Sequence, residues 1–309
     1  WFSSEQGETV GLVGGSGCGK STLGKTIARL YEPTAGSIHF EGTNLAPLSR
    51  GRLKPFRKEI QMIFQDPFSS LNPRMTVGDI VAEPLKVQAK QGGWISENNN
   101  GSIEDYVVDL LESVGLKSDD MRRYPHAFSG GQRQRIGIAR AFAGKPTLVV
   151  ADEPVSALDV SVQAAITELL MEIQREYGTT LLLISHDLSV VRYLSDRVVV
   201  MYLGKIVESG SRDQIFEPPY HPYTEALLAA APIADLRVKK RDIVLEGNLP
   251  SPLDPPKGWP VTERCRRRIG DVCDTTPAEE QISADGHRSA CHVPLDELSQ
   301  IDPVFAITE

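Results

Sequence analysis

The sequence predicts an α/β fold in which helices cover a parallel sheet, with an inserted helical subdomain and a loop-rich C-terminal extension. From Thr147 onward, short apolar runs that suit buried strands alternate with helical stretches. Residues 75–143 instead have mainly helical periodicity, and beyond Phe216 prolines become frequent. We therefore expect a core domain over residues 1–217, a helical subdomain inserted at about 70–144, and an extension over 218–309.

Length, charge and hydropathy limit the classes of function. The 309 residues are 40% hydrophobic, which is enough to bury a sizeable core. The formal net charge of -8 gives no general attraction to nucleic acid or to an anionic membrane surface. The longest apolar runs, such as residues 180–185, are too short to span a bilayer, so any membrane role is expected to be peripheral. Four cysteines and no visible secretory signal favour the cytoplasm, and a first residue other than methionine leads us to expect further sequence upstream.

The most specific motif follows the first predicted strand, Thr9 to Val13. The segment GGSGCGKS fits the pattern G-x-x-x-x-G-K-[ST] and lies between this strand and a helix expected from about Lys20. Its glycines let backbone amides surround phosphate groups, Lys20 neutralises the β- and γ-phosphates, and the Ser21 hydroxyl can ligate Mg²⁺. We therefore expect ATP and Mg²⁺ as ligands. The expected nucleotide-binding residues here are Gly14, Gly15, Ser16, Gly17, Cys18, Gly19, Lys20, Ser21 and Thr22.

A second motif places two carboxylates at the end of the predicted buried strand TLVVADE. Burying an acid pair is costly unless a metal ion or water occupies it. We expect Asp152 to hold Mg²⁺ and Glu153 to act as the general base for the attacking water. Gln65 and His186 also directly follow apolar strands, at the edge where open α/β sheets bind their ligands.

A third motif is SGGQRQR, residues 129–135, where a serine and two glycines open a predicted helix. Such a helix start turns its free N–H groups toward an anion. The chain therefore has two anion-binding helix starts but a single phosphate-loop lysine.

The ordered set of motifs resembles the nucleotide-binding subunit of an ABC transporter. GGSGCGKS, FQDP, SGGQ, VVADE, SALD and ISHD occur in that family's order across about residues 7–216. The resemblance implies a P-loop NTPase (RecA-like) core and head-to-tail pairing of two subunits, which explains the second helix start. In this pairing Ser129, Gly130, Gly131 and Gln132 close on ATP held by the partner's phosphate loop. The resemblance also implies that Gln65 senses Mg²⁺ and water, His186 touches the γ-phosphate and Asp159 organises the dimer seam.

The C-terminal extension resembles a narrower group. PPYHPYTEALLAAAP, residues 218–232, is similar to the C-terminal region of ATPases of the oligopeptide, dipeptide and nickel import group. This resemblance implies hydrolysis of ATP to ADP and phosphate to energise the import of peptides or related small solutes. The implied partners are a second ATP-binding subunit, two transmembrane permease subunits and an extracytoplasmic solute-binding protein. We expect a heterodimer, with a homodimer as the alternative, at the cytoplasmic face of the inner membrane, and no nucleic-acid partner.

Three alternatives accompany this interpretation. In the first, the chain is the second cassette of a longer tandem ATPase. In the second, it is a soluble ABC ATPase that acts on ribosomes or DNA, and in the third, a metal- or redox-sensing regulator. The second lacks the basic linker or coiled-coil insertion usual in that class.

The tail cysteines leave an iron–sulfur cluster open but doubtful. Cys265, Cys273 and Cys291 have the spacing C-x7-C-x17-C, whereas related extensions carry four cysteines, which some members use for a four-iron four-sulfur cluster. Trp259 stands where the first of the four is expected. A cluster then needs His292 or an outside ligand to complete its set, and thiols without a metal are the simpler interpretation.

Overall fold

The computed structural model describes residues 1–90, 102–231, 238–241, 243, 245, 247, 250–251 and 255–307. The chain divides into two compact units. One unit contains Trp1–Ser3, Thr9–Lys20 and Ser185–Glu309, and the other contains Ser4–Glu8 and Ser21–Ile184. We call them the loop unit and the acid unit, after the phosphate loop and the acidic strand end that they respectively contain.

The acid unit is built on three parallel strands. Strand β5 (Leu148–Asp152) pairs in parallel with β4 (Ile60–Ile63) on one side and with β6 (Thr180–Ile184) on the other. Strand β6 is buried throughout its length and β5 in all but its first residue, which accounts for their near-continuous apolar sequences. Helix α1 (Lys20–Ile27) precedes β4 in the chain, and α6 (Val160–Tyr177) lies between β5 and β6. Short elements α2 (Phe56–Glu59), β2 (His39–Phe40) and β3 (Thr43–Asn44) lie between α1 and β4 along the chain.

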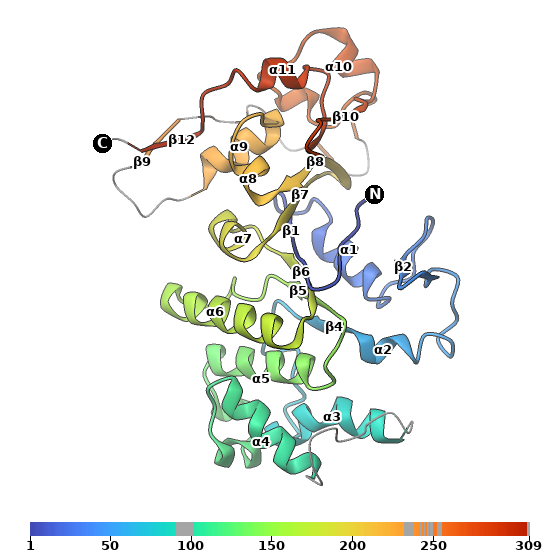
Figure 1. Ribbon diagram of the computed structural model, residues 1–309, viewed down its shortest axis with the longest axis vertical. Helices are drawn as coiled ribbons and strands as arrows, with labels where there is room; N and C mark the ends of the chain where they lie inside the picture. Colours follow the sequence, from blue (N-terminus) through green and yellow to red (C-terminus); the bar gives the residue numbers. More distant parts are fainter. Residues whose placement is uncertain are drawn as a thin grey trace. The chain divides into compact units, whose positions relative to one another are not determined.

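The described residues between Val77 and Phe142 are mainly helical, as the periodicity predicts. Helices α3 (Val77–Lys90) and α4 (Ile103–Ser113) pack on one another, and α5 (Gly130–Phe142) packs on α3, α4 and α6 (Figure 1). Two 3-10 turns, η1 (Ser118–Arg122) and η2 (Pro125–Ala127), connect α4 to α5. The core of this part consists of fully buried aliphatic side chains, including Leu85, Leu111, Ile136 and Ile138.

The loop unit combines one parallel strand pair with an antiparallel extension. Strand β1 (Thr9–Val13) pairs in parallel with β7 (Arg197–Tyr202), and β7 forms an antiparallel hairpin with β8 (Lys205–Ser211). Helix α7 (Leu188–Leu194) packs on β1, and α8 (Arg212–Phe216) packs on β8. The parallel strands of the two units confirm the predicted α/β fold with a central parallel sheet.

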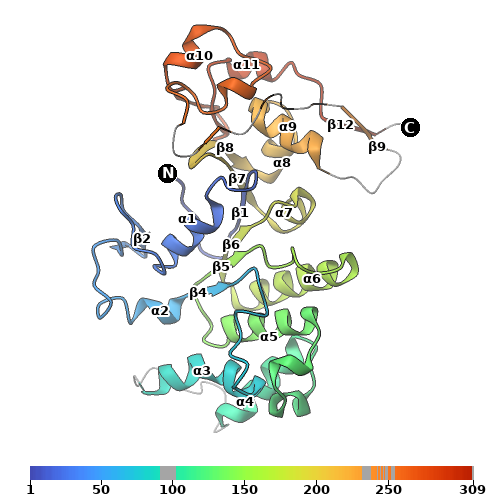
Figure 2. The same ribbon diagram turned by 180° about the vertical axis from the view of Figure 1, so that it is seen from behind.

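Much of the C-terminal part of the loop unit lies close to β8 in both views (Figures 1 and 2). Strand β11 (Arg288–Ala290) pairs with β8, and β10 (Glu280–Ile282) pairs with β11, both antiparallel. Helix α9 (Pro222–Ala230) is the longest helix of this part. The remaining elements are short, as a loop-rich extension predicts: η3 (Thr262–Arg264), α10 (Asp271–Thr275), α11 (Leu295–Leu298) and the strand pair β9 (Val238–Lys240) with β12 (Phe305–Ile307). The boundary at residues 217/218 stays a prediction.

Candidate functional site

The phosphate loop connects the end of β1 to Lys20, the first residue of α1. Gly14 has φ +153° and Gly17 has φ +76°, conformations that side chains rarely adopt. A Cβ atom on Gly14 would also lie 2.1 Å from the backbone oxygen of Met201, so only glycine fits there. The buried Lys20 ammonium donates to the carbonyl oxygens of Gly14 at 2.8 Å and Gly15 at 3.1 Å. The loop thus folds around its own lysine.

Cys18 lies inside this loop and is buried. Burial raises the pKa of its thiol, and the nearby Lys20 only partly opposes this effect. The thiol is therefore protonated near neutral pH, which makes it a poor nucleophile there.

Asp152, at the acidic strand end, is hydrogen-bonded to Ser21, the residue after the phosphate-loop lysine. Asp152 closes β5 with its side chain buried, and its Oδ1 accepts a hydrogen bond from the Ser21 hydroxyl at 2.7 Å. Two hard oxygen ligands are therefore side by side, which is the donor chemistry that Mg²⁺ prefers. Ser21 and Asp152 fit a magnesium ion.

Glu153 and Gln65 form a second pair in the acid unit. The Gln65 amide, in the loop after β4, donates to Glu153 Oε2 at 2.8 Å. Glu153 has φ +47°, an uncommon conformation for a residue other than glycine, and its N–H donates to the oxygen of Ile184 at 2.9 Å. Strained backbone of this kind concentrates at functional sites, because the surrounding structure has to hold it in place.

The serine of SGGQ caps α5, as its sequence predicts. The Ser129 hydroxyl accepts from the N–H of Gln132, and Gln132 Oε1 accepts from the N–H of Ser129 at 3.0 Å. This capping box fixes the helix start, where the free amides and the helix dipole favour an anion. A Cβ atom on Gly131 would lie 2.5 Å from the Val162 side chain, so the absence of a side chain at Gly131 lets the start of α6 approach closely.

The two remaining motif residues lie at exposed positions. Asp159 is the residue before α6 and makes no capping hydrogen bond with its side chain. His186 follows β6 by two residues. Their predicted roles in the dimer and at the γ-phosphate stay predictions.

The tail cysteines do not fit a metal cluster. Cys265, Cys273 and Cys291 belong to the described part of the chain, and within that part no group of three or more His, Cys, Asp or Glu side chains is arranged to hold a metal ion. Burial raises the pKa of Cys265 and raises that of Cys291 to about 12, which keeps both thiols protonated and poor as ligands. We derive no step through an iron–sulfur cluster.

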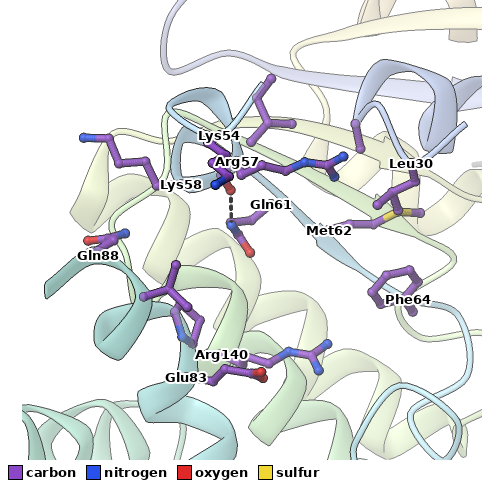
Figure 3. Close-up of a pocket in the computed structure, with 14 residues that line it drawn as sticks. Leu30, Lys54, Arg57, Lys58, Gln61, Met62, Phe64, Glu83, Gln88 and Arg140 are labelled. Atoms are coloured by element: carbon purple, nitrogen blue, oxygen red, sulfur yellow. Dashed lines mark hydrogen bonds between the residues drawn. The ribbon is translucent and has the colours of Figure 1, made fainter. Parts of the chain in front are cut away.

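A cavity of about 550 Å³ lies elsewhere in the acid unit, between β4 and helix α3 (Figure 3). Apolar side chains, among them Leu30, Met62, Phe64 and Val87, line it. Its polar lining is mainly basic, with Lys54, Arg57, Lys58 and Arg140 facing the single carboxylate of Glu83. The sequence analysis missed this cavity because segments far apart in the chain form it.

Fold and motifs together define a phosphate-loop ATPase. The ABC transporter family model matches residues 1–156, and the model named oligopeptide/dipeptide transporter, C-terminal region, matches residues 207–273. The chain is 50% identical to the putative oligopeptide transport ATP-binding protein YkfD of Bacillus subtilis (strain 168), over 94% of this chain and 87% of the relative. The oligopeptide transport ATP-binding protein AppF of the same organism gives the same identity and coverage. The chain therefore belongs to the ABC transporter ATP-binding family.

Solved structures agree with this assignment. A dimeric structure of a post-hydrolysis state of the ATP-binding cassette MJ0796, bound to ADP and Pi, aligns with a TM-score of 0.60 and 28% identity over 69% of this chain and 89% of that chain. The structure of cbiO1 from Clostridium perfringens, part of the ABC transporter complex cbiONQ, aligns with a TM-score of 0.59 and 28% identity over 69% of this chain and 80% of that chain. Within the described residues, no helix is both long and apolar enough to cross a membrane.

Proposed function

We propose that the chain binds and hydrolyses ATP to energise peptide import through separate membrane subunits. The observation that carries this proposal is the hydrogen bond between Ser21, at the end of the phosphate-loop motif, and Asp152, at the acidic strand end. The names of the relatives as oligopeptide transport ATP-binding proteins support the substrate class. Peptide-stimulated ATP hydrolysis by the chain, assembled with its partners, tests the function.

Each motif has a role in this chemistry. Lys20 and the loop amides bind the β- and γ-phosphates. Ser21, Asp152 and Gln65 would hold Mg²⁺, and the ion would supply positive charge against the phosphates. Glu153 accepts a proton from the attacking water as the new bond to the γ-phosphorus forms and the bond to ADP breaks. The amide that Gln65 donates to Glu153 orients this carboxylate. His186 contacts the γ-phosphate.

We further propose head-to-tail pairing with a second ATP-binding subunit, a heterodimer in the simplest case. The capped start of α5, Ser129 to Gln132, then binds ATP held by the partner, and Asp159 lies at the seam. The dimeric solved relatives support such pairing. An extracytoplasmic binding protein delivers the peptide, and the chain works at the cytoplasmic face of the inner membrane.

The cavity of the acid unit is the proposed docking site for a permease segment. Leu30 and Val87 line it while remaining 45% and 50% exposed, so they offer apolar surface to a partner. The basic side chains around them favour a segment with acidic residues.

Replacing Val87 by aspartate should weaken assembly with the permeases, because a carboxylate would be buried in an apolar contact. We expect at least a tenfold loss in recovery of permeases co-purified with the chain, with ATP binding unchanged. Ile282→Asp is the matched control, since Ile282 is 55% exposed on β10 and lies outside the cavity. Equal recovery of permeases with both variants would refute this docking site.

A further inference from the structure

The first turn of the phosphate loop is held by a residue from the C-terminal part of the chain. The N–H of Gly15 donates to the hydroxyl oxygen of Tyr223 at 2.7 Å, across a sequence separation of 208 residues. Tyr223 is 2% exposed, so its hydroxyl is shielded from solvent, and Gly15 is half-buried. A Cβ atom added to Gly15 would lie 3.1 Å from the same hydroxyl, which shows how closely the two residues approach.

The Tyr223 ring is itself fixed from several sides. It packs edge-on against Tyr202 of β7, with ring centroids 4.7 Å apart. His221, two residues before Tyr223, is the N-cap of α9. Its Nδ1 atom accepts a hydrogen bond from the N–H of Tyr223. Burial lowers the pKa of His221 to about 4, so this acceptor is neutral and available near neutral pH.

The cap is anchored in turn to the sheet of the loop unit. Glu208 of β8 accepts a hydrogen bond from the N–H of His221 at 2.8 Å, and its same oxygen lies 3.0 Å from His287 Nε2. All three side chains are buried. The position of the Tyr223 hydroxyl is therefore fixed by the start of α9, which His221 caps. His221 is in turn held by Glu208 of β8 and by the Ala290 oxygen of β11.

A buried tyrosine needs a partner for its hydroxyl, and many backbone groups would serve. The hydroxyl partner here is Gly15, and this part of the backbone also binds the Lys20 ammonium. The oxygens of Gly14 and Gly15 accept the two hydrogen bonds from the Lys20 ammonium, at 2.8 and 3.1 Å. Tyr223 thus holds the backbone segment that also positions the lysine expected to bind phosphate.

We propose that Tyr223 is a positioning residue for nucleotide binding, through which the C-terminal region sets the geometry of the phosphate loop. The proposal rests on the proposed function, namely that the loop binds ATP. A preorganised loop binds its ligand more tightly, because less ordering is left for the ligand to induce. Without the hydroxyl, the half-buried Gly15 N–H loses its acceptor within the protein and the turn relaxes toward other partners.

The test compares two tyrosine-to-phenylalanine variants of the full chain. Tyr223→Phe removes the hydroxyl that holds the loop. Tyr220→Phe removes an equally buried hydroxyl of the same region, which donates to Phe216 and accepts from the N–H of Val304. Both variants remove the hydroxyl of a buried tyrosine and a hydrogen bond with it, but only the first touches the phosphate loop.

We expect Tyr223→Phe to weaken ATP binding about fivefold, from the usual net contribution of one hydrogen bond. KM for ATP should rise in proportion, while kcat at saturating ATP stays within about twofold, because bound ATP restores the loop. Tyr220→Phe should leave the ATP dissociation constant within about twofold of the parent chain. An unchanged dissociation constant for Tyr223→Phe, or an equal loss in both variants, overturns the proposal.

A double-mutant cycle tests the same contact with a substitution in the phosphate loop. The single variant Gly15→Ala leaves α9 unaltered. Gly15→Ala crowds the Tyr223 hydroxyl, and Tyr223→Phe removes the crowded atom. We expect Gly15→Ala to cost less ATP affinity in the Tyr223→Phe background than in the parent chain. Additive effects overturn the proposal. If the parent chain itself does not bind ATP, the proposed function fails as well.

Discussion

Glu153→Gln should slow ATP turnover severely while leaving ATP binding intact. The substitution keeps the size of the side chain but removes the carboxylate that accepts the proton of the attacking water. Loss of a general base usually lowers the rate by about 10²- to 10⁴-fold, and kcat should fall by that factor. Because ATP stays bound and unhydrolysed, the closed dimer should accumulate, and size-exclusion chromatography with Mg²⁺ and ATP should show it.

Glu172→Gln is the matched control for this experiment. Glu172 is an exposed residue of α6, and its substitution makes the same change of charge without touching the pair of Gln65 and Glu153. Its turnover should equal that of the parent chain. Normal hydrolysis by Glu153→Gln would remove Glu153 from the role of base, whatever the control shows.

Lys20→Ala should weaken ATP binding about a hundredfold or more, since charge-assisted hydrogen bonds to phosphate are the strong contacts of such a loop. The structure adds a second cause, because the Lys20 ammonium bonds the oxygens of Gly14 and Gly15 and its removal leaves this turn without its central donor. Titration with a fluorescent ATP analogue, followed by competition with ATP, measures the loss.

Lys25→Ala serves as the comparison for Lys20→Ala. Lys25 lies in the last turn of α1, where its ammonium lies over the ring of Tyr31. ATP binding should be unaffected there. Equal binding by Lys20→Ala and the parent chain would contradict the assignment of GGSGCGKS as the nucleotide loop.

The parts of the site that the sequence predicted are those encoded by local pattern. An apolar run followed by carboxylates predicted the end of β5 at Asp152. The glycine spacing with one lysine predicted the phosphate loop before α1. The serine before two glycines predicted the start of α5, and the capping box at Ser129 confirms it. Each of these features depends on neighbours within a few residues of the chain.

The parts that sequence reasoning missed depend on distant contacts. Tyr223 reads locally as a residue packed in a rigid turn, and nothing in its neighbourhood indicates that its hydroxyl meets Gly15. Strands β10 and β11 are three residues each, too short for a period of two to stand out. They are ordered by distant pairing, since β11 pairs with β8 and β10 pairs with β11. The cavity lining was missed because it combines residues between positions 28 and 140.

The measurement that tests the account most directly is ATP hydrolysis by this chain assembled in membranes with its partner ATPase, permeases and peptide-loaded binding protein. Dipeptides, oligopeptides, nickel and glutathione should be compared. We expect a peptide-loaded binding protein to stimulate hydrolysis, and Glu153→Gln to eliminate this stimulation. Hydrolysis that continues unchanged with every solute and every membrane partner would contradict coupling to peptide import.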